Sequence, residues 1–140
     1  MSTFPRSAYD LTGGLLYFAR MCDKIRLNAA DNLAAEYHKN VGKGFDGRMC
    51  QYLHVDYEKL RERVLAGGTD EEALNWCYEN GRKFNDMDII VWNGFARKRG
   101  WHDDDGGTQF LAESKAASGL KDRDEIETMF DFYDVDEQRK

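Results

Sequence analysis

The sequence predicts an all-α fold: a single compact domain spanning residues 1–140, with about six or seven short helices and an extended N-terminal arm. Apolar residues recur at spacings of three and four along the chain, and no segment alternates as a strand does. Glycine pairs and capping residues divide the pattern into short segments. With 140 residues, 41% of them hydrophobic, the chain can bury one core without disulfides or metals.

The arm and the first helix are predicted from the N-terminal residues. Residues 1–13 form the arm, because Pro5 disfavours helical geometry in the residue before it. The pair Gly13-Gly14 then interrupts the chain. A helix is expected over residues 15–29, where apolar side chains fall on one face.

Capping residues and glycines bound the later helices. Thr69 with Glu72 has the spacing of a capping box, and Asn85 with Asp88 suggests another capped start. A short helical turn is expected over 33–37. The further helices are expected over residues 45–54, 56–66, 69–79, 87–98 and 108–117, and from Asp122 or Asp124 to a C-terminus that frays over 136–140.

The formal net charge of −6 is unevenly distributed. Residues 1–63 carry 10 basic and 8 acidic side chains, whereas residues 64–140 carry 10 basic and 18 acidic ones. An anion-binding site is therefore expected in the N-terminal half. The overall negative charge argues against nucleic acid as a partner, and no apolar run approaches the ~20 residues that span a bilayer.

The cysteines and histidines predict neither a disulfide framework nor a metal site. The three cysteines, Cys22, Cys50 and Cys77, contain no CxxC pair, and the histidines lack a metal-ligand spacing such as HExxH. We therefore expect free, buried thiols, a cytoplasmic location, no metal and no cofactor.

A charged cluster on the first helix is the leading candidate site. Arg20 and Lys24 are four residues apart, and Asp23 lies three residues from both Arg20 and Arg26. A carboxylate flanked by cations in this way can orient donors toward a substrate carboxylate or phosphate. The alternative is a solvated helix face with ordinary ion pairs.

The arm adds Arg6 and Tyr9 to this cluster. Phe4 and Tyr9 provide apolar anchors, so the arm has reason to dock on the first helix, where Asp23 is the best placed acceptor for Arg6. One Asp cannot neutralise four cations, and the surplus charge calls for an anion or for further carboxylates.

Further candidates follow the first helix. His38, after Tyr37, is the best general acid or base by residue type, and Asp46 could orient it or cap the next helix. Lys43, between two glycines, could reach an anion or be an ordinary loop lysine. A structural histidine is the alternative for His38.

Several segments resemble a bacterial family of small proteins, domain of unknown function 5069. They are PRSAYD (5–10), GGLLYFARMCDKIR (13–26), EYH (36–38), GFDGR (44–48) and GGTDEEALNWC (67–77). The resemblance covers roughly residues 3–135 and implies a single-domain cytoplasmic protein, without implying a reaction. It singles out Arg6, Gly13, Gly14, Arg20, Asp23, Lys24, Arg26 and Tyr37, and in the loop before the second helix only Asp46 matches.

Three hypotheses remain open from the sequence. The first is a module that binds a small anionic ligand or a protein partner through Arg6, Tyr9, Arg20, Lys24, Arg26 and Tyr37, with Asp23 in the cluster. The second is a small enzyme with Asp23, His38 or Asp46 as acid or base. The third is a structural protein whose charges form an internal salt-bridge network. The oligomeric state is not predicted.

Overall fold

Seven α-helices and one 3-10 helix make up most of residues 3–140, which a computed structural model describes. The mostly α-helical fold is thus confirmed, and the only sheet in this part of the chain has two strands of two residues each. The elements in chain order are β1 (Leu11–Thr12), β2 (Leu15–Leu16), α1 (Phe18–Ala29), η1 (Ala35–Asn40), α2 (Phe45–Leu53), α3 (Tyr57–Leu65), α4 (Asp70–Asn80), α5 (Asp86–Lys98), α6 (Gly107–Ala117) and α7 (Met129–Asp136).

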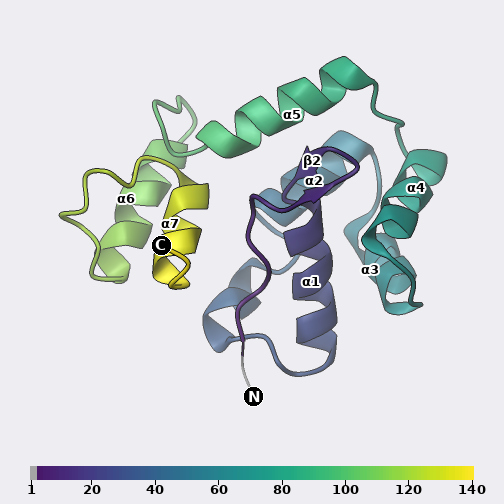
Figure 1. Cartoon of the computed structure of the whole chain (residues 1–140), viewed down its shortest axis with the longest axis horizontal. Coiled ribbons are helices and arrows are strands. Elements are labelled where there is room, and N and C mark those ends of the chain that lie inside the picture. The colour runs from purple at the N-terminus through teal and green to yellow at the C-terminus, as the bar shows by residue number, and fades with distance from the viewer. Residues whose placement is uncertain (1–2) are drawn as a thin grey trace.

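The helices form two groups bridged by α5 (Figure 1). α1 runs through the middle, with α3 and α4 to one side and the α6–α7 pair to the other. α5 crosses above them and leads from α4 to α6. The N-terminal arm passes between α1 and the α6–α7 pair.

The first helix begins later than expected. Residues 15–16 belong to β2, which pairs with β1 in an antiparallel hairpin closed by Gly13-Gly14. Both glycines have positive φ, the conformation that two-residue hairpin turns require. α5 holds the hairpin, because the side-chain amide of Asn93 donates to the Gly14 carbonyl and its oxygen accepts from the Leu16 N–H.

The capped helices are confirmed with their predicted starts. Asp56 accepts from the Lys59 N–H at the start of α3. Complete capping boxes begin α4 at Thr69 and α5 at Asn85. In each case the deciding interaction spans three residues, so it can be predicted from the local sequence.

The last helix starts at Met129 rather than at Asp122 or Asp124, which is a correction. Thr128 caps it by accepting from the Asp131 N–H, and the Met129 N–H donates to the Arg99 carbonyl. The residues after α7 also differ from the expected frayed end, since Glu137 is buried and Arg139 donates to the Pro5 carbonyl. Both differences depend on contacts with distant parts of the chain.

The core between the two groups is aromatic. The rings of Tyr17, Phe45 and Phe130 lie within 5.0–6.2 Å of one another, measured between centroids. The three cysteines are free and buried, as predicted, and burial raises the pKa of each thiol. They pack as small apolar side chains.

Candidate functional site

Two cations of the charged stripe of α1 are buried, so a solvated helix face is excluded for them, whereas Asp23 and Arg26 are half-buried. Arg20 is 2% exposed and Lys24 is 5% exposed. Each cation has its own carboxylate partner from a distant segment: Glu137 for Arg20 and Asp46 for Lys24. Two cations that look equivalent in the sequence therefore have separate environments.

Arg20 holds the C-terminal segment through a bidentate ion pair. Its two terminal nitrogens donate to the Glu137 carboxylate at 2.9 and 2.7 Å, and one of them also donates to the Arg6 carbonyl at 3.0 Å. Tyr37 and Arg139 donate to the same carboxylate. Burial alone would raise the pKa of Glu137, but these donors and the charge of Arg20 keep it below its ordinary value.

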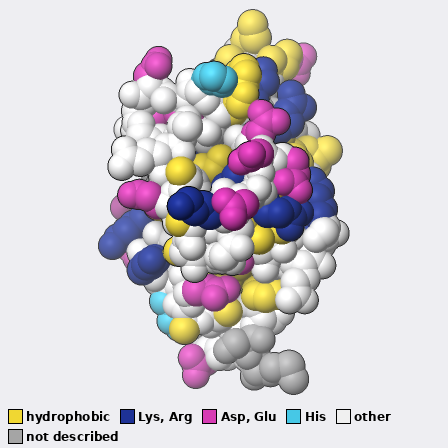
Figure 2. All heavy atoms as spheres, turned by 90° about the vertical axis from the view of Figure 1, so that its left-hand side faces the viewer, with side chains coloured by type: hydrophobic (Ala, Val, Ile, Leu, Met, Phe, Trp, Pro, Cys, Tyr) yellow, Lys and Arg dark blue, Asp and Glu magenta, His cyan; other side chains and the backbone are white. Residues whose placement is uncertain are grey.

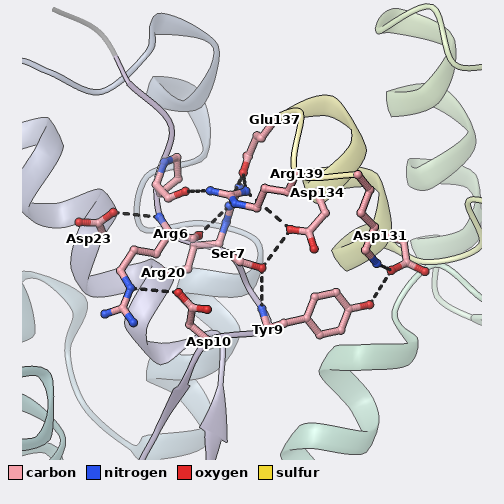
Figure 3. Close-up of polar contacts among 12 residues, drawn as sticks. Arg6, Ser7, Tyr9, Asp10, Arg20, Asp23, Asp131, Asp134, Glu137 and Arg139 are labelled. Carbon is pink, nitrogen blue, oxygen red and sulfur yellow. Dashed lines mark hydrogen bonds and ion pairs between the residues drawn. The ribbon is translucent and has the colours of Figure 1, made fainter.

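The arm is tied to α1 and α7 by further polar contacts (Figure 3). Asp23 accepts from the backbone N–H of Arg6, not from its side chain. Tyr9 donates to Asp131 at 2.7 Å, and Ser7 donates to Asp134 at 3.0 Å. These contacts fasten the arm and leave Tyr9 engaged with α7.

The two remaining arginines of the predicted cluster share Asp70. The guanidinium of Arg6 lies 3.2 Å from it and that of Arg26 lies 2.7 Å from it. Arg6 also pairs with Asp10. The predicted cluster is therefore divided, and most of its members have the contacts of an internal salt-bridge network.

Lys24 forms a second buried group with Asp46 and Tyr17. Its ammonium lies 3.0 Å from one Asp46 oxygen and 3.4 Å from the Tyr17 hydroxyl, which donates to the other Asp46 oxygen at 2.6 Å. Asp46 also accepts from the Gly42 N–H. Burial lowers the pKa of Lys24, and the Asp46 carboxylate acts against this shift.

Tyr17 has an unfavourable backbone conformation. Its φ of 77° lies in the left-handed region, which is strained for a bulky side chain. Burial raises its pKa well above the ordinary value, so the hydroxyl stays protonated. Strain of this kind persists only where the surroundings over-determine it, and it clusters at functional sites.

A cavity of about 370 Å³ opens above Lys24 and Tyr17, and we call it the cationic cavity. Its charged lining consists of four cations and a single carboxylate, that of Asp105. The basic side chains are Lys24, Lys43, Arg48 and Arg99. Its apolar walls are Tyr17, Phe45, Phe110, Met129 and Tyr133.

Two helix N-termini also line the cationic cavity. α2 starts after Gly44 and α6 after Gly106, and neither has a side-chain cap. The Asp46 N–H of α2 donates to the Lys43 carbonyl, while the other N–H groups of the two first turns and the helix dipoles favour negative charge. Asp105 neutralises part of the positive charge, since its carboxylate lies 2.5 Å from Arg99 and 3.7 Å from Arg48.

Gly107 positions Arg99 at the edge of this cavity. Arg99 pairs with Asp103, and a Cβ at Gly107 would lie 2.8 Å from the guanidinium carbon of Arg99 and would clash with a carboxylate oxygen of Asp103. Only glycine permits this approach without displacing the pair. The start of α6 and the Arg99 side chain are thereby fixed together.

A second cavity, of about 670 Å³, adjoins the first and shares Tyr17, Lys24 and Tyr133 with it. Its lining has more carboxylates than cations. The cations are Arg20, Lys24 and Lys39, and the carboxylates are Glu36, Glu113, Asp136 and Glu137. The outer surface of the α6–α7 pair likewise mixes cations and carboxylates (Figure 2). The cationic cavity differs from this adjoining cavity in having more cations than carboxylates in its lining.

The other predicted residues lie apart from the cationic cavity. His38 is exposed on η1, with its Nε2 2.9 Å from the Leu33 carbonyl oxygen. Asp23 faces the arm, and Arg20 and Tyr37 line the adjoining cavity. Over residues 3–140, no cluster of three or more His, Cys, Asp or Glu is arranged to hold a metal ion.

Lys24, Lys43 and Asp46 are among the residues predicted from the sequence, whereas Arg48 and Arg99 are not. Arg48 lies one turn into α2, so the Gly42-Lys43-Gly44 loop is the signal that could have indicated it. Arg99 comes from the distant end of α5, and nothing in the local sequence relates it to α2.

These features define a small helical protein with a buried lysine at the base of a positively charged cavity. Residues 2–139 match the model of a family described as Domain of unknown function (DUF5069), and the chain belongs to this family. No curated protein matches the sequence. None of the helices described over residues 3–140 has the length and apolar character that a membrane span requires.

Proposed function

We propose that this protein binds a small molecule that carries an anionic group on a flat apolar body, and that it does so in the cationic cavity. The observation that carries the proposal is the lining of this cavity, where four cations face a single carboxylate. Lys24 pairs with Asp46 and Arg99 pairs with Asp103 and Asp105, so the surplus positive charge lies on Lys43 and Arg48. Surplus positive charge in a partly desolvated place favours an anion.

The anionic group would lie among Lys43, Arg48 and the N-terminus of α2. Over residues 3–140, the side chain of Lys43 has no hydrogen bond or ion pair, and the guanidinium of Arg48 has a 3.7 Å contact with Asp105 and lies 5.8 Å from the centroid of the Phe95 ring. Both side chains are exposed at the mouth, so they are free to turn toward a ligand. The uncapped start of α2 adds backbone donors.

The apolar body would lie on the aromatic walls. Phe45 and Tyr133 line the cavity from α2 and α7, and Phe110 and Met129 close it from α6 and α7. A volume of about 370 Å³ is in the range of small-molecule sites. Apolar and aromatic walls with a few polar groups are typical of sites that bind small organic molecules.

We also propose that this binding takes place in the cytoplasm of a bacterium, without nucleic acid or membrane as partner. The three free, buried cysteines and the net charge of −6 support this assignment. The proposal is one of binding, and it assigns no reaction.

The test compares inorganic phosphate with phenyl phosphate as ligands, using thermal unfolding and titration calorimetry. Phenyl phosphate should stabilise the protein more, because it also covers the aromatic walls. At one hundred times its Kd a ligand stabilises the native state by about 2.7 kcal/mol. Lys43→Gln with Arg48→Gln should abolish the shift, whereas Asp105→Asn should enlarge it by removing the competing carboxylate.

Lys59→Gln is the matched control, because Lys59 is an exposed lysine on α3 outside the cavity. Its response to both ligands should equal that of the wild type. The proposal fails if neither ligand binds the wild type, or if the double variant binds phenyl phosphate as well as the control does.

A further inference from the structure

The outer face of α5 is apolar and uncovered by the rest of the described chain. Met87 is 63% exposed, Ile90 65% and Val91 50%. These residues lie at helical spacings of three and four, and Gly94 continues the same stripe. The opposite face is buried, since Trp92 packs inward and donates to the Leu16 carbonyl.

Nothing in the structure of a single chain requires glycine at position 94. A Cβ at this position would meet nothing within 4 Å, and its φ is not positive. Glycine in the middle of a helix costs roughly 1 kcal/mol relative to alanine. Gly94 leaves open space in the apolar stripe where any other residue would place a side chain.

The ends of α5 carry opposite charges that lack partners. Asp86 is exposed in the first turn, and Arg97 and Lys98 are exposed in the last turn. Over residues 3–140 none of these three side chains has an ion pair. An antiparallel copy of α5 would bring the acidic end of each helix to the basic end of the other.

We propose that α5 is the surface through which two copies of this chain associate, packed antiparallel about a two-fold axis. One register satisfies both features: a helix pair centred on residue 92 places Ile90 against Gly94 of the second copy and Asp86 against Lys98 of the second copy. The apolar contact and the charge contact are then formed twice, as an isologous interface requires.

A groove beside the stripe enlarges this surface. It has a volume of about 680 Å³ and lies between α2 and α5, with Tyr52, Val91, Trp92 and Phe95 among its lining residues. Because Val91 belongs to both the stripe and the groove, a projecting side chain of the second copy can enter the groove. Two helices alone bury less than a standard interface, so the dimer is weak and reversible.

The experiment measures the dimer dissociation constant by sedimentation velocity over a wide range of protein concentration. Ile90→Glu should raise this constant roughly thirtyfold or more, as loss of a central anchor does. Asp86→Lys should raise it roughly fivefold, and the double variant Asp86→Lys/Lys98→Asp should restore it. Leu65→Glu, on α3, is the control for an exposed apolar residue and should leave association unchanged.

Gly94→Ala separates an interface role from a folding role. In the monomer this change should raise the unfolding midpoint, because alanine favours the helix, while in the dimer it should weaken association by filling the open space at this position. A wild type that stays monomeric at every concentration overturns the proposal. A dimer that Ile90→Glu leaves intact also overturns it, as does a double variant Asp86→Lys/Lys98→Asp that associates more weakly than Asp86→Lys alone.

Discussion

Arg20 and Lys24 lie one helical turn apart on α1, yet they serve different purposes. The guanidinium of Arg20 is saturated by Glu137, the Arg6 carbonyl and the ring of Tyr133, 4.3 Å away. Lys24 is held by Asp46 and faces the cationic cavity. The sequence shows two cations on one face, but their roles depend on which carboxylate reaches each of them.

Replacing Glu137 by Gln should destabilise the fold strongly. The change leaves Arg20 buried without its counter-charge, and breaking a buried pair in this way costs about 3–5 kcal/mol. Urea unfolding at neutral pH measures the loss. Glu113→Gln, at an exposed glutamate on α6, should change the free energy of unfolding by less than about 0.5 kcal/mol; an equal loss in both variants would contradict a structural role for the Arg20–Glu137 pair.

At the scale of elements, a helix start that depends on residues nearby in the sequence is predictable, whereas a start that depends on contacts with distant residues is not. The starts of α3, α4 and α5 depend on a capping residue and its partner three positions on. The hairpin before α1 depends on Asn93, and the start of α7 packs against Arg99. The local pattern therefore predicts a helix at residues 15–16, where the structure has a strand, and predicts too early a start for the last helix.

The candidate site is likewise predictable only where its residues are indicated by the local sequence. Lys24 and Asp46 could be found because α1 and the loop before α2 carry conspicuous charges. Arg99 could not, because it joins the cavity only when α5 and α6 fold back on α2. The guanidinium of Arg6 was predicted to pair with Asp23, but it pairs with Asp10 and Asp70 instead. No local pattern in the sequence indicates these two partners.

The capping box at the start of α4 should contribute measurably to the stability of the fold. Thr69→Ala removes an acceptor for the Glu72 N–H and should cost about 1 kcal/mol of stability. Thr69→Ser, which keeps the hydroxyl, should cost much less. Chemical denaturation of the two variants provides the comparison, and equal stability of the alanine and serine forms would contradict it.

The whole molecule should lose stability in acid. The pKa values of Glu72, Asp88, Asp105, Glu125, Asp131 and Glu137 all lie below their ordinary values. Their ionised forms therefore favour the folded state above the unfolded-chain pKa of about 4, and this stabilisation disappears as the pH falls through the folded-state values. Asp136, whose pKa burial raises, acts in the opposite sense.

Urea midpoints measured from pH 7 down to pH 3 should decline below about pH 5. The decline should be shallower in Glu137→Gln, since that variant lacks the carboxyl group whose ionised form Arg20 stabilises in the folded state. A wild-type midpoint that rises on acidification would contradict this assignment of the carboxyl groups.

The pairing of Arg20 with Glu137 also sets the order in which a nascent chain can finish folding. The two residues are 117 positions apart, so Arg20 leaves the ribosome long before its carboxylate exists. Until Glu137 is synthesised, closing the core around α1 would bury an uncompensated guanidinium, which is costly. The middle of the molecule should therefore stay open during translation and close after residue 137 has emerged.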